Sequence, residues 1–114
     1  MANQYKNWSD EQIKAVWEKG TIVPGYDPDK FRQDIAGAWI EYSKHGKTGN
    51  ELGLGWEIDH RKPESRDGKT ELANLRPLQW ANNRAKGDNY PNWSSVVSSE
   101  DDKNIRKNKS WIIK

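Results

Sequence analysis

The chain has 114 residues, of which 32% are hydrophobic and 32% are charged, and its formal net charge is +2. The length predicts a single domain, and the lack of cysteine excludes disulfide bonds and thiolate zinc sites. No apolar run approaches the roughly 20 residues of a membrane span, and the N-terminal sequence MANQYKNWSDEQ lacks signal-peptide character. We therefore expect a cytoplasmic protein with no membrane partner.

The N-terminal third predicts two helices. Ser9 and Gln12 have the spacing of a capping box, and an apolar face follows them, so we expect a helix over 10–19. The pair Asp27-Pro28 is typical of a helix cap followed by proline in the first turn. This pair predicts a short second helix near 28–35.

The middle of the chain predicts strands and loops. Residues 37–46 contain β-formers followed by a turn, and 56–59 form a second short apolar run, so both are expected to be strands. The glycine-rich segment 46–55 lacks the order of a P-loop and is interpreted as a flexible connection. Residues 64–71 are expected to form a polar loop with a tight turn at Asp67-Gly68.

The C-terminal third predicts a brief extended run at 74–78 and a helix at 79–87 that ends at a glycine. Residues 94–110 are polar and are expected to form a mobile tail, while the final SWIIK docks back on the body. We expect the tryptophans with periodic or apolar neighbours to fill much of the core, since each ring buries on the order of 200 Å². These are Trp17, Trp39, Trp56 and Trp80.

The positive charge of the chain is concentrated in one segment. Residues 1–60 have a net charge of −3, residues 61–86 have +4, and residues 87–114 have +1. A polyanion is attracted to such a segment. On charge alone, an ordinary solvated surface explains the excess better than a binding site does.

Several polar residues gather around this basic segment in the predicted strand, loop, strand and helix. Asp59 and His60 end the first strand, Asn74 begins the second, and Asn82 and Asn83 lie on the helix. Carboxylate and amide oxygens are hard ligands that suit Mg²⁺ or Mn²⁺. A histidine near the metal is the usual proton acceptor close to pH 7.

The segments EIDHRKP (57–63) and NLRPLQWANNRAKGD (74–88) resemble the HNH endonucleases. Asp59-His60, the fourteen residues from His60 to Asn74, and the nine from there to Asn83 agree with that family in order and spacing. The resemblance covers about residues 56–88. The upstream segment at 20–46 is similar to the leader of small stand-alone HNH proteins of bacteria and phages.

The resemblance implies a role for each matching residue. Asp59 and Asn83 would be the metal ligands, which makes the chain an H-N-N variant, and Asn82 is the alternative to Asn83. His60 would be the general base that takes a proton from water. Asn74 would pin the loop and help to orient the histidine.

The fold implied by the resemblance is α+β, with a ββα-metal (His-Me finger) core at 56–88 and N-terminal helices and short strands packed against it. The nuclease domain is expected to span 1–93, and a polar, partly basic tail to span 94–114. One Mg²⁺ or Mn²⁺ ion is implied. No structural zinc is expected, because Gln79 and Asn82 stand where relatives carry cysteines.

The function implied is that of a metal-dependent DNA endonuclease or nicking endonuclease acting on double-stranded DNA. A monomer would nick and a dimer would cut both strands, and a phage or restriction partner would supply sequence specificity. The expected phosphate contacts are basic residues in and after the loop: Arg61, Lys62, Arg66, Lys69, Arg84 and Lys86.

Two other functions remain open on the sequence, a non-catalytic DNA-binding module on the same scaffold and a nuclease that acts on RNA. A toxin of the bacteriocin type would need delivery segments that this chain lacks room for. His45 is expected to be a solvated loop residue. Arg32 is expected either to reach a phosphate or, more simply, to form an ion pair with Asp34.

Overall fold

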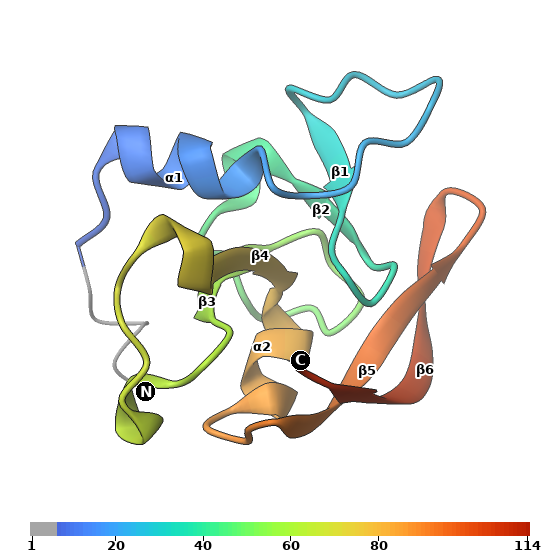
Figure 1. Ribbon diagram of the computed structural model, residues 1–114. Coiled ribbons are helices and arrows are strands. Elements are labelled where there is room, and N and C mark those ends of the chain that lie inside the picture. The colour runs from blue at the N-terminus through green and yellow to red at the C-terminus, as the bar shows by residue number, and fades with distance from the viewer. Residues whose placement is uncertain (1–6) are drawn as a thin grey trace.

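A computed structural model describes residues 7–114 as a mixed fold of α-helices and small antiparallel sheets (Figure 1). Each sheet in this range has two strands, so the expected combination of helices and strands is confirmed at this level. The helices are α1 (Asp10–Trp17) and α2 (Trp80–Lys86), and the strand pairs are β1 (Phe31–Gln33) with β2 (Trp39–Glu41), β3 (Trp56–His60) with β4 (Leu75–Gln79), and β5 (Asn92–Glu100) with β6 (Lys103–Ile112).

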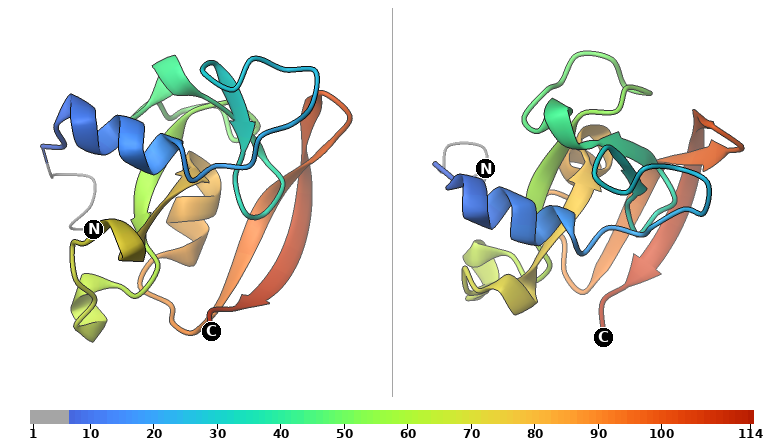
Figure 2. Two further views of the ribbon diagram at one scale, coloured as in Figure 1. Left: turned by 45° about the horizontal axis from the view of Figure 1, so that its top comes forward. Right: turned by 90° about the horizontal axis from the view of Figure 1, so that it is seen from above.

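The elements are layered around β3 and β4. Helix α1 packs on β4, and helix α2 lies between the β3–β4 pair and the β5–β6 hairpin (Figures 1 and 2). The radius of gyration is 12.9 Å, close to the value expected for one compact domain of this length. No helix in residues 7–114 is both long and apolar enough to cross a membrane.

Helix α1 forms where its caps predict it. The Ser9 side chain accepts a hydrogen bond from the Gln12 backbone N–H at 3.1 Å, and the Gln12 side chain accepts one from the Ser9 N–H at 2.9 Å. This reciprocal capping box satisfies two N–H groups that would otherwise lack partners. The helix buries Val16 and Trp17 and ends at the latter, two residues earlier than predicted.

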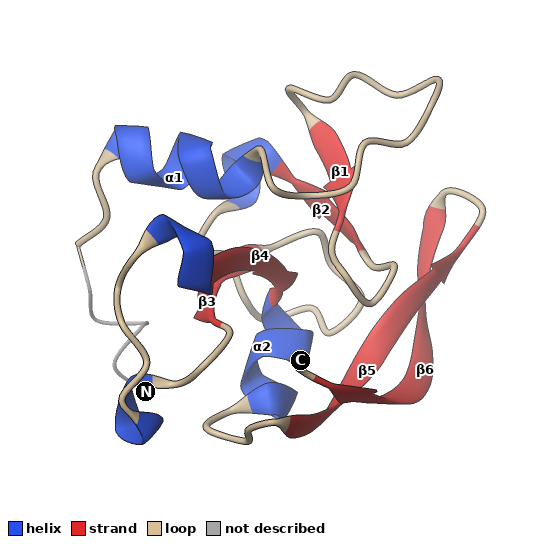
Figure 3. Ribbon diagram, viewed as in Figure 1, coloured by secondary structure: helices blue, strands red, loops and turns tan. Residues whose placement is uncertain are grey.

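The predicted helix at 28–35 is wrong, because this segment contains strand β1 (Figure 3). The Asp27 carbonyl accepts the Phe31 N–H at 2.9 Å, so a single turn forms after Asp27 and then stops. Pairing with β2 decides the outcome, with Arg32 opposite Ile40. The strand predicted at 37–46 is confirmed only over β2, and a 3₁₀ turn at Tyr42–Lys44 follows it.

The expected mobile tail is also wrong, because residues 92–112 form the longest hairpin described in the protein. Every second residue of its first half is buried, namely Trp93, Ser95 and Val97. Because a serine occupies one of these buried positions, the alternation of buried and exposed residues does not show in the sequence as an alternation of apolar and polar residues. Val97 packs with Ala38 and with Ala81 of α2, so no domain boundary falls at residue 93.

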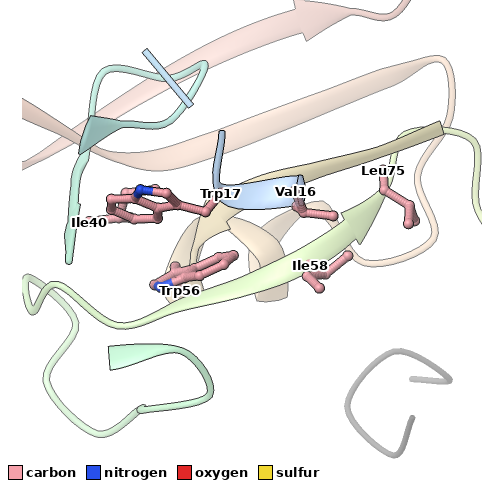
Figure 4. Close-up of a cluster of buried hydrophobic side chains, with 6 residues drawn as sticks. All are labelled: Val16, Trp17, Ile40, Trp56, Ile58 and Leu75. Carbon is pink, nitrogen blue, oxygen red and sulfur yellow. The ribbon is translucent and has the colours of Figure 1, made fainter. Parts of the chain in front are cut away.

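The main apolar core lies between α1 and β3 (Figure 4). Its members are Val16, Trp17, Ile40, Trp56, Ile58 and Leu75. Three of the four expected core tryptophans are buried, and Trp80 is only half-buried. Trp93 is buried as well, with 4% of its surface exposed, because the hairpin carries it inward.

Gln79 connects α2 to the glycine-rich segment 46–55. Its side-chain oxygen accepts the N–H groups of Ala81 and Asn82 and so caps the helix. Its amide nitrogen donates to the carbonyls of Glu51 at 2.7 Å and Gly53 at 3.0 Å. The segment is therefore tied to the body by two partly buried hydrogen bonds, in contrast to the flexible connection that we expected.

Candidate active site

Strand β3 sends its last two side chains to opposite faces of the β3–β4 pair, because successive residues of a strand alternate. Asp59 faces α2, and His60 lies on the side of the loop at 61–70. Each has only 2% of its surface exposed. The sequence places the two residues side by side, whereas the fold separates their functional groups.

The Asp59 carboxylate is held between two cations. Its Oδ2 lies 2.9 Å from Arg76 Nε, and its Oδ1 lies 3.2 Å from Lys86 Nζ. Burial raises the pKa of Asp59, and the charges of Lys86 and Arg76 oppose that rise. Burial also lowers the pKa of Lys86, against the opposing effect of Asp59. The three groups form one buried polar cluster.

The burial of Lys86 corrects the expectation that this residue contacts a phosphate. The side chain is fully buried, and its ammonium also donates to the His60 carbonyl at 3.0 Å. Arg84, which precedes it by two positions, is exposed and forms a salt bridge with Glu57 at 2.7 Å. Arg84 therefore remains on a surface that a phosphate can reach.

His60 lies beside the polar loop and the residue before α1. Its Nε2 is 2.9 Å from Thr70 Oγ1 and 3.9 Å from Glu64 Oε2. The indole of Trp8 covers the ring at a centroid distance of 6.1 Å. The imidazole is thus oriented by a hydroxyl near a carboxylate, but it is shielded from solvent.

Asn74 ties the loop at 61–70 to the start of β4. Its side-chain oxygen accepts the Lys62 N–H at 2.9 Å, and its amide nitrogen donates to the carbonyls of Lys62 and Lys69. The Asn74 carbonyl also accepts the Arg61 N–H at 2.7 Å. These contacts fix the backbone that directly follows His60, which is the pinning that the resemblance implies for this residue.

The two asparagines of α2 face different neighbours. Asn82 is fully buried, and its amide contacts Asp34 and the backbone of Val96 and Val97. Asn83 instead faces β3, where its Nδ2 donates to Glu57 Oε1 at 3.0 Å. Of the two, only Asn83 therefore lies on the face that carries Asp59.

The remaining phosphate candidates lie around the loop. Lys62, Arg66 and Lys69 are exposed, and Arg61 is half-buried. Their placement keeps a basic surface next to His60. Of the residues predicted to contact phosphates in this loop, Lys62, Arg66 and Lys69 are thus exposed to solvent.

Arg32 and Asp34 do not form the expected ion pair with each other among the described contacts. Arg32 is buried and donates to the carbonyls of Pro28, Glu18 and Gly20. Asp34 accepts backbone N–H groups and the Asn82 amide. Both side chains therefore bond groups of the protein interior.

His45 departs from the solvated loop residue that we expected. It is half-buried and packs on Trp56 at a centroid distance of 4.8 Å. Burial lowers its pKa, which favours the neutral ring.

The sequence did not indicate Glu57 and Arg76 as site residues. Glu57 lies two positions before Asp59, so alternation places both carboxylates on the α2 side of β3. Arg76 stands directly opposite Asp59 in the strand pair. The recurrence of an acid at 57 and 59 in WEIDH was the signal for Glu57. Only the strand register reveals Arg76.

The donor chemistry fits a hard divalent cation. Asp59, Glu57 and the Asn83 amide offer oxygen atoms, the ligands that Mg²⁺ and Mn²⁺ prefer. Lys86 and Arg76 already stand at the Asp59 carboxylate, so a metal ion would have to displace one of these cations to bind there. Within residues 7–114, however, no group of three or more His, Cys, Asp or Glu side chains is close enough to hold a metal by itself.

Comparisons with protein-family models, with curated proteins and with solved structures find no match to this chain.

Proposed function

We propose that the protein is a metal-dependent endonuclease that hydrolyses phosphodiester bonds of DNA, with a ββα-metal core formed by β3, β4 and α2. The observation that carries the proposal is the anchored end of β3. There a buried carboxylate faces α2, a histidine faces the basic loop, and Asn74 fixes the backbone between them.

In this proposal His60 takes a proton from the attacking water. The Thr70 hydroxyl at 2.9 Å and the Glu64 carboxylate at 3.9 Å set the orientation of the ring and stabilise its positive charge after proton transfer. Because Trp8 and the loop cover the ring, they must move aside when DNA binds. The proposal therefore includes opening of this cover.

Asp59 and Asn83 would hold one Mg²⁺ or Mn²⁺ ion, which supplies stabilisation of negative charge on the phosphate in the transition state. The exposed cations Lys62, Arg66, Lys69 and Arg84 would bind neighbouring phosphates, which positions the strand without reading its sequence. A single site of this kind cuts one strand, so a monomer would nick.

The test is cleavage of supercoiled plasmid by the parent, His60→Ala and His45→Ala in Mg²⁺, Mn²⁺ or EDTA. The parent is expected to produce open circles with either metal and none in EDTA. Loss of a general base lowers the rate about 10²-fold or more, so His60→Ala should be nearly inactive. His45→Ala is the matched control, because it removes the other histidine of the chain and should keep its activity.

Equal cleavage by the parent and His60→Ala would refute the role of His60. Cleavage of an RNA strand in the same buffers, with no cleavage of DNA, would move the proposal to an RNA substrate.

A non-catalytic DNA-binding module is the second candidate, and one observation favours it. The Asp59 carboxylate is neutralised by two cations and His60 is buried, as both would be in a purely structural role. Binding of DNA that weakens steeply with salt, without cleavage in any metal, would support this candidate.

A further inference from the structure

A cavity of about 460 Å³ lies beside the candidate active site, between the end of α1, strand β4 and the end of β6. Its polar lining includes Lys19, Arg61 and Arg76, and its apolar lining includes Trp93, Trp111 and Ile112. The volume lies within the range of about 300–1,000 Å³ that is typical of small-ligand sites.

The cavity is connected to the candidate site through two arginines. Arg76 binds Asp59 at 2.9 Å and also lines the cavity. Arg61 directly follows His60 in the chain. A ligand in the cavity would therefore lie next to the end of β3.

The charges around the cavity leave a place for an anion. Burial lowers the pKa of Lys19, and the charges of Arg61 and Arg76 lower it further. Arg76 is neutralised by Asp59, whereas neither Lys19 nor Arg61 has an ion pair among the described residues. The Lys19 ammonium donates to the carbonyls of Leu72 and Leu75, which leaves one of its three N–H donors for a ligand. Asp34 also lines the cavity, but its two oxygens already accept four N–H groups.

The apolar wall is built from a column of stacked groups. The Arg76 guanidinium lies 4.9 Å from the Trp93 ring, Trp93 stacks on Trp111 at 5.9 Å, and Lys109 lies 5.8 Å from the Trp111 ring. Arg76 and Lys109 therefore flank the stacked pair, and both tryptophans line the cavity. Ile112, which is 65% exposed, extends this surface toward solvent.

We propose that this cavity binds one unpaired nucleotide of a DNA strand, with its phosphate at Lys19 and Arg61 and its base against the wall of Trp111 and Ile112. Basic groups beside aromatic side chains are the usual components of single-strand binding sites. A base in a duplex can enter only by leaving its stack, at a cost of a few kcal/mol. The site therefore selects single-stranded or locally melted DNA. The inference rests on the proposed action on DNA.

The test measures anisotropy of a fluorescent oligothymidylate, of its duplex with oligoadenylate, and of an abasic phosphodiester of equal length, all in EDTA. The parent is expected to bind the single strand roughly tenfold more tightly than either other probe. Arg61→Gln should weaken binding of all three, whereas Trp111→Leu should weaken only the thymidylate. Lys107→Gln is the matched control, because Lys107 is an exposed cation of β6 outside the cavity.

A second pair of variants does not depend on the tryptophan stack. Ile112→Glu and Ile112→Lys alter an exposed side chain, so both should fold, and they should weaken and strengthen single-strand binding respectively, each by about threefold or more. Equal affinity of the parent for single strand and duplex would overturn the proposal. So would Arg61 and Ile112 variants that behave like Lys107→Gln.

The experiment separates this inference from the proposed function because EDTA prevents cleavage. A parent that nicks plasmid in Mg²⁺ but shows no single-strand preference would retain the nuclease and refute the nucleotide site. A preference for the single strand without cleavage in any metal would support the nucleotide site and refute the nuclease.

Discussion

At the scale of single residues, the cations at Asp59 are the central feature of the site. A carboxylate that is 2% exposed needs compensating charge, and Arg76 and Lys86 provide it. The same two cations would compete with a metal for the oxygens of Asp59. Metal affinity should therefore depend on Lys86, a residue that never reaches the surface.

The substitution Lys86→Met tests this competition. Removal of one positive charge from Asp59 should tighten Mn²⁺ binding about tenfold, measured by calorimetry. It should also cost about 3 kcal/mol of stability, because a buried pair loses one partner while Arg76 remains.

Asp59→Asn should abolish Mn²⁺ binding, and Lys107→Met should leave it unchanged. If Mn²⁺ binds Lys86→Met, Asp59→Asn and the parent equally well, then the metal does not bind at Asp59.

At the scale of elements, helix α2 joins the β3–β4 pair to the β5–β6 hairpin through polar side chains. Asn82 donates to Asp34 at 3.1 Å and to the Val97 carbonyl at 2.9 Å, and accepts the N–H groups of Val96 and Val97 at 2.8 Å. Because three of these contacts are buried and the one to Val96 is partly buried, the amide must supply both donors and an acceptor in one orientation.

The substitution Asn82→Asp preserves the shape of the side chain and removes its donors. The new carboxylate would face the Asp34 carboxylate and the Val97 carbonyl, so urea unfolding should show a loss of at least about 3 kcal/mol. Asn89→Asp, on an exposed position, should change stability by no more than about 0.5 kcal/mol. Similar stabilities of the two variants would show that the four hydrogen bonds of Asn82 do not stabilise the fold.

At the scale of the whole molecule, the hairpin completes the fold. Trp93 and Val97 are buried by it, and Ser98 and Ser99 donate to the carbonyls of Ala36 and Gly37 in the turn between β1 and β2. Asn104 accepts the Trp39 N–H of β2. The last two strands therefore stabilise elements that precede the candidate site.

Hydrogen exchange distinguishes such a hairpin from a mobile tail. The amide of Val97 should exchange only through global unfolding, at a rate similar to that of Ile58 in β3, since its hydrogen bond to Asn82 is buried. The Val96 amide bonds the same oxygen in a partly buried position and should also be protected. Exchange within seconds across 92–112 would show instead that this segment opens independently of the body.

The sequence by itself determined the features with local causes. Helix α1 follows from the capping box of Ser9 and Gln12, and α2 ends at Gly87 as its sequence predicts. The strand that ends on Asp59 and His60 and the loop that Asn74 closes also follow from nearby residues. Their apolar patterns and turn signals act within a few positions of the chain.

Only the tertiary structure decided the rest. Strand pairing, not local propensity, made residues 31–33 extended, and packing on α2 placed the serine-rich segment in a hairpin. Lys86 is buried only because Asp59 lies across from it, and Arg76 joins that pair only through the register of β4. These outcomes depend on residues far apart in sequence. The free-energy cost of burying a charge or a hydroxyl depends on the hydrogen-bond or ion-pair partner that the fold places beside it.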